Sequence, residues 1–572
     1  MRDSKWFLAG SISLITFLVY LPTLRNGFVW DDMPYIVENL HIRSFNATML
    51  KWAFTHFYQS NWHPLTWISH ALDHAIWGLD PLGHHLTNII LHSVNTFTAT
   101  CLAMKLIEAS ERAGIIDGLP LLLNKRELLI AGGVSGILFG LHPLHVESVA
   151  WIAERKDLLC ALFFLLSISA YANYIRVREA NQQASLSAFS HRPYLFSFGF
   201  FILALLSKPM AVSLPAVLLI LDWYPFRRIQ SIETLRSALA DKLPFIGLSL
   251  ISSVLTILAQ KAGGALVSMD FIPLLPRLLT AAESLVAYLW RMMTPLNLIP
   301  YYPYRPNASL VSIEYVGSIV LVLGITIACA ITAKRQRLWL SVWSYYVITL
   351  MPTLGLVQVG NQSSADRYTY LPSLGPFLVA GIMMAWVWKK TEGATKRKAL
   401  PLMAVSFAVF LFVLASMSYL TSKQIGIWNN DIVLFSYLIE KEPERLPFAY
   451  YNRGTIYHAT GQSKKAIEDF DKAISLRPSY HEAYYNRGTA FAMTGQFNKA
   501  IQDFNKAISL NPSYPQAYYN RGLAFYNIGE SKKAIEDFDK AISLRPSYHE
   551  AHRNRGVVLD KMGRINKPNN GS

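Results

Sequence analysis

Two adjacent carboxylates stand directly beyond the first apolar stretch of the chain. Asp31 and Asp32 follow the stretch 6–24, which would place them near the depth of lipid headgroups if that stretch crosses a membrane. One of them could act as a general base and deprotonate an acceptor hydroxyl while a lipid-linked donor approaches from the bilayer. The alternative is that the pair caps the following helix, which is a common role for aspartate.

Four basic residues could neutralise the phosphate of such a donor. Arg155 and Lys156 occur in the polar segment 142–157, Arg367 lies in a second polar segment, and Lys208 occupies a turn between two apolar helices. Arginine fits phosphate geometry better than lysine does. Ionisable groups beside a membrane helix cost free energy, so they are usually paired or functional. The alternatives are an interfacial salt-bridge cluster and, for Lys208, a side chain that snorkels to the surface.

A further set of polar residues near these positions is expected to bind substrate. Ten of the 15 histidines precede residue 150. His70 and His74 have a spacing that could suit a metal, but neither an HExxH motif nor a cysteine partner accompanies them, so we expect no metal site and no cofactor. The expected substrate-binding set is His63, His85, His142, His145, Glu147, Glu154, Asp366 and Tyr368.

The composition indicates an integral membrane protein. Of 572 residues, 52% are hydrophobic and 16% are charged, with a mean hydropathy of +0.25. Soluble domains carry roughly 25% charged residues, so disorder, a disulfide scaffold and a single soluble enzyme are excluded. The net charge of +16 indicates basic cytoplasmic loops rather than nucleic-acid binding. Cys101, Cys160 and Cys329 lie in apolar runs, so no disulfide is expected.

Residues 1–422 are predicted to form an all-α, polytopic membrane bundle of about eleven transmembrane helices. The prediction depends on repeated apolar stretches of membrane-spanning length. The expected spans are 6–24, 85–107, 128–142, 158–175, 194–207, 210–225, 244–260, 313–333, 338–356, 369–388 and 399–421.

Short basic connections predict the orientation of this bundle, because lysine and arginine favour cytoplasmic loops. The expected cytoplasmic connections are 227–242, 334–337 and 389–398. Counting crossings then places the polar loops on the extracytoplasmic side, and these are 25–84, 143–157 and 357–368. The apolar stretch 273–300 contains Arg277, Glu283 and Arg291, and a full crossing there would reverse the 334–337 loop. We therefore expect it to be interfacial or re-entrant.

The C-terminal part repeats a 34-residue unit. Glycine recurs at this spacing at 454, 488, 522 and 556, and proline recurs at 478, 512 and 546. The accompanying small and aromatic positions fit the tetratricopeptide pattern, which predicts an α-solenoid of helical hairpins. The expected units are 447–480, 481–514, 515–548 and a partial unit at 549–572, preceded by a connecting degenerate repeat helix within 423–446.

The first helix of each repeat carries a recurring Tyr-Tyr-Asn-Arg sequence. Tyr450, Tyr484 and Tyr518 occupy packing positions, whereas the neighbouring asparagines and arginines are expected to form a polar ladder suited to an extended peptide or a glycan. The alternative is that near-identical repeats reflect recent duplication. Because the last expected span ends outside, the repeats are expected to be extracytoplasmic.

Motifs for nucleotide chemistry are missing from the sequence. It contains no P-loop, no GxGxxG after a strand, no Ser-His-Asp spacing and no Cys-rich zinc signature. The concentration of reactive groups is expected to face outward, where activated nucleotides are scarce. A lipid-phosphate donor is the plausible alternative.

With these residues in view, the chain resembles the transmembrane and tetratricopeptide-repeat-containing O-mannosyltransferase family over nearly its whole length, as a bacterial member. The resemblance is carried by the repeats and by five segments, namely NGFVWDD at 26–32, NWHPLTWISHALDHAIWGLDPLGHHLTNIILH at 61–92, LHPLHVESVAWIAERKDLL at 141–159, LSKPMAVSLPAVLLILDWYP at 206–225 and ADRYTYLP at 365–372.

The resemblance implies a GT-C glycosyltransferase fold and maps the acidic motif of the family onto Asp31 and Asp32. It implies a multi-pass protein of the bacterial inner membrane that transfers a mannose-like sugar, with inversion, from a polyprenyl phosphate to a hydroxyl of an acceptor protein or glycan. No divalent metal is required, because arginines and lysines can stabilise the phosphate leaving group. The repeats would bind the acceptor or a partner protein. The alternatives are a non-catalytic membrane scaffold that displays the repeats, and a lipid-linked glycan ligase or transporter.

Overall fold

The computed structural model describes residues 2–112, 123–180, 188–305, 308–392 and 396–565. Within these ranges the chain is helical apart from β1 (Tyr302–Pro303) and β2 (Gln362–Ser364), which pair antiparallel. It divides into two compact units, Met1–Asn430 and Asp431–Ser572. The all-α fold class expected from the sequence, a helix bundle followed by helical repeats, is confirmed.

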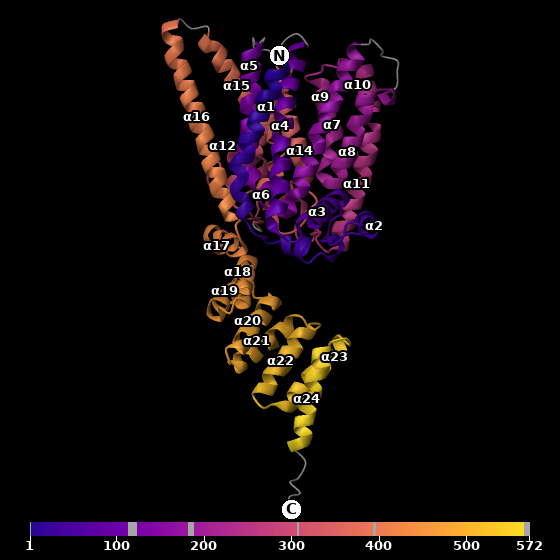
Figure 1. The fold of residues 1–572 in the computed structure, drawn as a ribbon, viewed down its shortest axis with the longest axis vertical. Coiled ribbons are helices and arrows are strands. Elements are labelled where there is room, and N and C mark those ends of the chain that lie inside the picture. The colour runs from indigo at the N-terminus through magenta and orange to yellow at the C-terminus, as the bar shows by residue number, and fades with distance from the viewer. Residues whose placement is uncertain (1, 113–122, 181–187, 306–307, 393–395, 566–572) are drawn as a thin grey trace, which may run out of the picture. The chain divides into compact units, whose positions relative to one another are not determined.

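The first unit is a bundle of apolar helices that run side by side (Figure 1). Each expected span overlaps one of these helices, with ends that differ by a few residues. They are α1 (Arg2–Tyr20), α4 (Pro81–Arg112), α5 (Lys125–Leu141), α7 (Arg155–Ala180), α8 (Arg192–Ser207), α9 (Leu214–Trp223), α11 (Leu243–Ala262), α13 (Ile313–Thr332), α14 (Arg337–Leu350), α15 (Leu374–Glu392) and α16 (Lys396–Ile427).

Six helical segments of the described chain are long and apolar enough to cross a membrane. They are Asp3–Arg25, Pro81–Glu111, Ile152–Glu179, Leu243–Ala262, Ile313–Thr332 and Phe407–Ile427. A seventh span is possible if α5 is taken together with Pro143–Ala150, which follows it across a bend of 47°. Pro143 disfavours a helical conformation at His142, which explains the bend. The count of about eleven crossings stays a prediction.

A row of glycines brings α5 close to α4. Gly132, Gly136 and Gly140 are spaced four residues apart, so they share one helix face. A Cβ added at Gly136 would lie 2.0 Å from Thr100 Oγ1. Small residues allow such close packing between membrane helices. This packing positions the polar segment that follows α5 against α4.

The apolar segment that does not fit the span count forms α12 (Leu274–Met293). Its buried face carries Arg277, whose guanidinium donates to the carbonyl oxygens of Val267, Ser268 and Leu356. Leu278 and Trp290 on α12 are exposed. An amphipathic helix with exposed leucine and tryptophan suits the membrane interface better than a full crossing.

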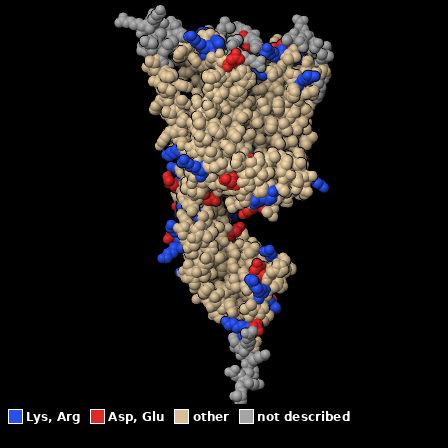
Figure 2. Space-filling model, in the orientation of Figure 1, with Lys and Arg blue, Asp and Glu red and all other residues tan. Residues whose placement is uncertain are grey.

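The two ends of the bundle differ in charge and in regularity. The connections 227–242 and 334–337, together with the described residues of 389–398, define the basic end, where Figure 2 shows lysines and arginines gathered beyond a largely uncharged band. The opposite end, here called the loop end, carries the short elements α2 (Ala47–Thr55), α3 (Pro64–Trp77) and α6 (Val146–Ala150), whereas α10 (Ile232–Ala240) lies at the basic end.

Short 3₁₀ or π turns complete the first unit. They are η1 (Leu21–Arg25), η2 (Met33–Val37), η3 (Leu40–Ile42), η4 (Pro143–His145), η5 (Ile152–Glu154), η6 (Ala188–Ser190), η7 (Pro209–Ser213), η8 (Met351–Thr353) and η9 (Asp366–Thr369). Of these, η2, η4, η5, η7 and η9 carry or adjoin the polar residues that the sequence singles out.

The second unit is a stack of helical hairpins. A Cβ added at Gly454 would lie 2.9 Å from the Phe470 ring, and Gly488 and Gly522 make the same approach to their own phenylalanines. The glycine therefore lets the two helices of each hairpin touch. The helices are α17 (Asp431–Lys441), α18 (Pro447–Ala459), α19 (Ser463–Leu476), α20 (His481–Met493), α21 (Phe497–Leu510), α22 (Pro515–Asn527), α23 (Ser531–Leu544) and α24 (His549–Ile565).

The recurring asparagines and arginines are bonded within the array rather than displayed as a free ladder. Arg453 donates two hydrogen bonds to Asp469, at 2.8 and 2.7 Å, and Arg487 and Arg521 repeat this pairing. Asn486 Nδ2 donates to Tyr451 Oη of the preceding repeat at 3.1 Å. These contacts favour a structural role for the arginines and for Asn486, and the expected ligand ladder stays a prediction. Tyr450 and Tyr518 are buried, as expected of packing positions.

Candidate functional site

The adjacent aspartates lie in a strained turn that directs them to different surroundings. Trp30 has a φ of 51°, a left-handed conformation that is rare for a bulky residue, and its ring stacks on Trp151 with centroids 5.1 Å apart. Asp32 is fully buried. Its carboxylate accepts hydrogen bonds from the amides of Val29, at 3.0 Å, and Ala153, at 2.7 Å. Asp32 therefore anchors the first loop to η5.

Asp31, in contrast, is open to solvent. Its side chain is exposed, and no hydrogen bond or ion pair joins its carboxylate to another residue that the structure describes. The charged groups that act on it are Lys156, Glu154 and Arg367. Displacement of water by the surrounding protein raises the pKa of the Asp31 carboxyl, and the charge of Lys156 opposes this shift. Asp31 is thus a free carboxylate beside a charged cluster.

The centre of that cluster is Glu154, the last residue of η5. Its Oε1 lies 2.9 Å from Lys156 Nζ and 3.3 Å from Arg367 Nε, and its Oε2 lies 3.3 Å from Lys208 Nζ. One carboxylate therefore contacts three cations that come from three separate segments of the chain. We call Glu154, Lys156, Lys208 and Arg367, together with Glu147 and Asp157, the loop-end cluster.

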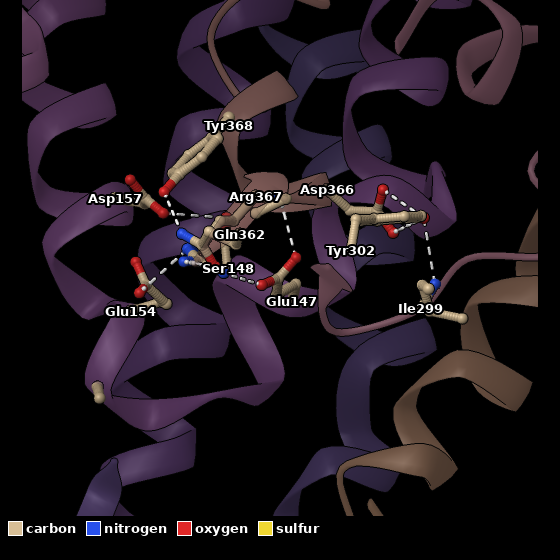
Figure 3. A network of polar contacts seen from close by, with 12 residues as sticks. Glu147, Ser148, Glu154, Asp157, Ile299, Tyr302, Gln362, Asp366, Arg367 and Tyr368 are labelled. Atoms are coloured by element: carbon tan, nitrogen blue, oxygen red, sulfur yellow. Dashed lines mark hydrogen bonds and ion pairs between the residues drawn. The ribbon is translucent and has the colours of Figure 1, made fainter. Parts of the chain in front are cut away.

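Two further carboxylates complete the loop-end cluster. Glu147 on α6 pairs with the Arg367 guanidinium and also accepts from the Arg367 amide at 3.0 Å (Figure 3). Asp157 accepts from Lys208 Nζ at 2.6 Å. The aromatic rings of Trp151 and Tyr368 face the Arg367 guanidinium. The cluster thus contains three cations and three carboxylates.

Arg155 has a different environment from its neighbour Lys156. It is fully buried, and its guanidinium lies 2.5 Å from Asp73 Oδ2 and donates to Asn88 Oδ1 and to the His84 carbonyl, both at 2.8 Å. These contacts tie α3, α4 and α7 together. The expected contact of Arg155 with a donor phosphate therefore does not fit this geometry, because protein groups already occupy its donors.

The expected substrate-binding histidines are also buried in scaffold contacts. His85 contacts the Gly27 carbonyl, His142 donates to the Met292 carbonyl at 3.0 Å, and His145 donates to the Phe139 carbonyl at 2.7 Å. His63 contacts Tyr35 Oη at 3.1 Å, and burial holds its pKa well below the usual value. These contacts assign the four side chains to the framework rather than to a ligand surface.

The two residues beside Arg367 serve the cluster in different ways. Asp366 accepts from Tyr302 Oη at 3.0 Å and lies 3.5 Å from Arg291 of α12, and burial raises its pKa to about 7 (Figure 3). It fixes η9 against β1 and α12. Tyr368 accepts from Gln362 at 2.6 Å, and its ring faces Lys208. Tyr368 therefore contacts the loop-end cluster, whereas Asp366 holds η9, the turn that carries Arg367, in place.

Sequence reasoning missed Asp157 and Arg291 as parts of this site. Asp157 lies one helical turn after Glu154, a spacing that places both on one helix face, and this signal was present in the ERKD segment. Arg291 stood out as a charge in an apolar stretch. Among the described residues, no group of three or more His, Cys, Asp or Glu side chains is placed to hold a metal ion.

An apolar pocket lies among the helices of the first unit, toward the basic end, where Tyr224 and Leu338 contribute to its lining. Leu102 of α4, Val217 of α9 and Leu378 of α15 contribute to its lining. A space of this composition accommodates a hydrocarbon chain rather than a polar ligand.

Comparisons with known proteins cover both units. Tetratricopeptide-repeat models match residues 447–480 and 515–548, and a further TPR repeat model matches residues 490–529. Protein O-mannosyl-transferase F38B6.6 of Caenorhabditis elegans is 23% identical over 82% of this chain and 62% of its own length. Protein O-mannosyl-transferase Tmtc1 of Drosophila melanogaster is 31% identical over 30% of this chain and 19% of its own length.

Among solved structures, MamA 41-end from Desulfovibrio magneticus RS-1 is similar to 23% of this chain and to 74% of its own, at 25% identity and a TM-score of 0.22. The chain thus spans less than two thirds of the length of the two relatives named above. It carries tetratricopeptide repeats, and its similarity to proteins named protein O-mannosyl-transferases extends well beyond those repeats.

Proposed function

We propose that this chain is an integral-membrane glycosyltransferase that moves a mannose-like sugar from a polyprenyl phosphate to a hydroxyl group of an acceptor. The observation that carries the proposal is the contrast between Asp31 and Asp32. The Asp32 carboxylate is buried and accepts two amide hydrogen bonds, whereas Asp31 is exposed, has no hydrogen bond or ion pair among the described residues, and lies near Lys156 and Arg367. A free carboxylate next to a cluster that contains three cations has the two parts that this transfer needs.

The proposed reaction is a single displacement. Asp31 takes the proton of the acceptor hydroxyl, and the oxygen attacks C1 of the sugar while the bond from C1 to the phosphate oxygen breaks. The electron pair leaves on the phosphate, and the configuration at C1 inverts. Lys156, Lys208 and Arg367 stabilise the charge that develops on the leaving phosphate. No metal is needed in this scheme, because the cations supply the electrostatic stabilisation.

The remaining residues of the expected site hold this arrangement in place. Glu147 positions Arg367 through two contacts, and Asp366 fixes the turn that carries it. Arg155, His85, His142 and His145 belong to the framework behind the cluster. Tyr368 is the aromatic residue that we propose for contact with the sugar, because its ring faces the cations.

The names of the relatives support the choice of a mannose-like sugar and of a protein acceptor. The tetratricopeptide repeats support a second surface that binds the acceptor or a partner protein. Polyprenyl phosphate is our choice of carrier, because the loop-end cluster lies at one end of an apolar bundle, where a phosphate on a lipid can reach it from the membrane.

The orientation of the bundle is a separate part of the proposal. The basic connections should face the cytoplasm, which places Asp31 and the repeats outside in a bacterial inner membrane. A reporter that is active only after export, fused after Ser572, should be active. Activity of a reporter that works only in the cytoplasm would overturn this orientation and the donor assignment with it.

The function is tested by transfer from a synthetic mannosyl-phosphoryl-polyprenol to peptide acceptors, with the full-length protein in lipid nanodiscs. Asp31→Asn should lower turnover about 10²-fold or more, since it removes the base. Asp270→Asn, which alters another exposed aspartate of the first unit, is the matched control and should retain wild-type turnover. Wild-type turnover in a folded Asp31→Asn variant would remove the proposed base, and a wild-type protein that transfers no sugar would favour the scaffold alternative.

A further inference from the structure

Glu154 contacts more cations than the other two carboxylates of the loop-end cluster. Its single carboxylate contacts Lys156, Lys208 and Arg367. Two of these cations have a second carboxylate of their own, since Arg367 pairs with Glu147 and Lys208 pairs with Asp157. Among the described residues, Lys156 has its ion pair with Glu154 alone. Departure of Glu154 would therefore leave these two pairs in place and would open all three cations to another anion.

The net charge of the cluster also favours replacement of Glu154 by an anionic ligand. With all groups ionised, three cations face three carboxylates, and the sum is zero. Without the charge of Glu154 the cluster would carry one positive charge. A sugar phosphodiester carries one negative charge, so it would restore neutrality in the place of Glu154. If Glu154 stayed charged, the donor would add an uncompensated negative charge to a buried site, which is costly.

The geometry also suits an exchange between a carboxylate and a phosphate. Both groups present oxygen acceptors that lysine and arginine recognise with similar contacts. The three cations are not sealed off, since the side chains of Lys156, Lys208 and Arg367 are 12%, 11% and 9% exposed. They converge from α7, from the turn before η7 and from η9, so an anion at the position of Glu154 could contact all three.

We propose that Glu154 is a stand-in for the donor phosphate: it holds the three cations together while the site is empty and yields them when the phosphodiester binds. This inference rests on the proposed function and names a positioning residue for it. A buried carboxylate that loses its cations is stable only as the neutral acid. Donor binding should therefore be accompanied by uptake of one proton.

The groups that surround Glu154 bear on this proton. They are Lys156 and Asp157 on α7, Lys208 before η7, Arg367 on η9, Glu147 on α6, Asp31 and Tyr35 in the first loop, and His63 before α3. Asp157 lies within hydrogen-bonding reach of Glu154, so a proton taken up there is shared by the two carboxyls.

The test measures binding of mannosyl-phosphoryl-farnesol to the full-length protein by titration calorimetry at pH 8. Titration in two buffers with different ionisation enthalpies gives the number of protons taken up. The wild-type protein should take up about one proton per donor. Glu154→Gln has no charge to give up, so it should take up none and bind the donor about tenfold more tightly. Glu314→Gln, which removes the same charge from an exposed ion pair with Arg305, is the matched control and should behave as wild type.

Binding to the wild-type protein without proton uptake would overturn the inference, and this measurement needs no variant. Weaker or unchanged binding in a folded Glu154→Gln protein would also overturn it, because a merely structural carboxylate gives that result. If the wild-type protein does not bind the probe at all, the proposed function fails and the inference falls with it.

Discussion

The polar contacts of the repeats and those of the loop-end cluster use the same residue types in opposite ways. In the repeats, an arginine and an aspartate 16 residues apart form the same ion pair three times, each with two hydrogen bonds whose N–O distances are 2.6–2.8 Å. In the loop-end cluster, one glutamate is shared by cations from three distant segments, and a carboxylate nearby has no partner among the described residues. A contact that recurs in every repeat has a structural role. A cluster in which several cations share one carboxylate, in contrast, can bind an anionic ligand in place of that carboxylate.

The most direct test of this difference makes the same substitution, arginine to glutamine, in both regions. Arg367→Gln removes a proposed contact to the leaving phosphate. The kcat/KM of donor hydrolysis should therefore fall about 10²-fold, as expected for a lost charge-assisted hydrogen bond. Arg487→Gln breaks one of the repeated pairs and should leave the kcat/KM of donor hydrolysis unchanged. Both variants are measured on protein that elutes as a single folded species. An equal loss of kcat/KM in both would mean that the two kinds of contact do not differ in role.

Removal of the repeats tests the comparison at the level of whole units. Residues 425–430 belong to the first unit, since the Asn429 carbonyl accepts from the Gly27 amide and the Trp428 ring packs on Trp151. A truncation should therefore end at Asn430. We expect acceptor transfer to fall about tenfold, because tethering supplies a local excess of acceptor, while donor binding and slow donor hydrolysis persist. Loss of donor binding in a truncated protein that inserts normally would show that the repeats are needed for the donor site.

The sequence could predict the helices and the repeats because both follow from local patterns. Apolar stretches marked the helices of the bundle, and the 34-residue spacing marked the hairpins. It could not separate Asp31 from Asp32 or Arg155 from Lys156. Neighbouring residues point in different directions, and which of them becomes buried depends on segments far away in the chain. Arg367 and Glu147 are 220 residues apart, so no local pattern reveals that they pair.

The pH dependence of turnover tests whether the open carboxylate is the base. Desolvation raises the pKa of Asp31, and Lys156 opposes this shift. A base acts only when it is deprotonated, so kcat at saturating donor should fall as the pH is lowered through this raised pKa. The acid limb should lie above the value of about 3.9 for an ordinary aspartate. Lys156→Gln removes the opposing charge and should move the limb to higher pH. A limb at the same pH in wild type and Lys156→Gln would argue that another group titrates.

The smallest expected effect concerns the contacts between neighbouring repeats. Tyr451→Phe removes the hydroxyl that accepts from Asn486 at 3.1 Å but keeps the ring, which packs on Tyr480 with centroids 4.9 Å apart. A hydrogen bond of this kind contributes about 1 kcal/mol, and Asn486 also lies 3.3 Å from Thr455 Oγ1, which lessens the loss. Hydrogen exchange should therefore show slightly faster opening of α18 and α20, with donor binding unchanged. Because repeat stability depends on contacts between neighbours, the same change at Tyr485 should have a similar effect around α20 and α22. A change in donor affinity on Tyr451→Phe would contradict the assignment of this ladder to the scaffold, since nothing in its contacts would then explain the coupling.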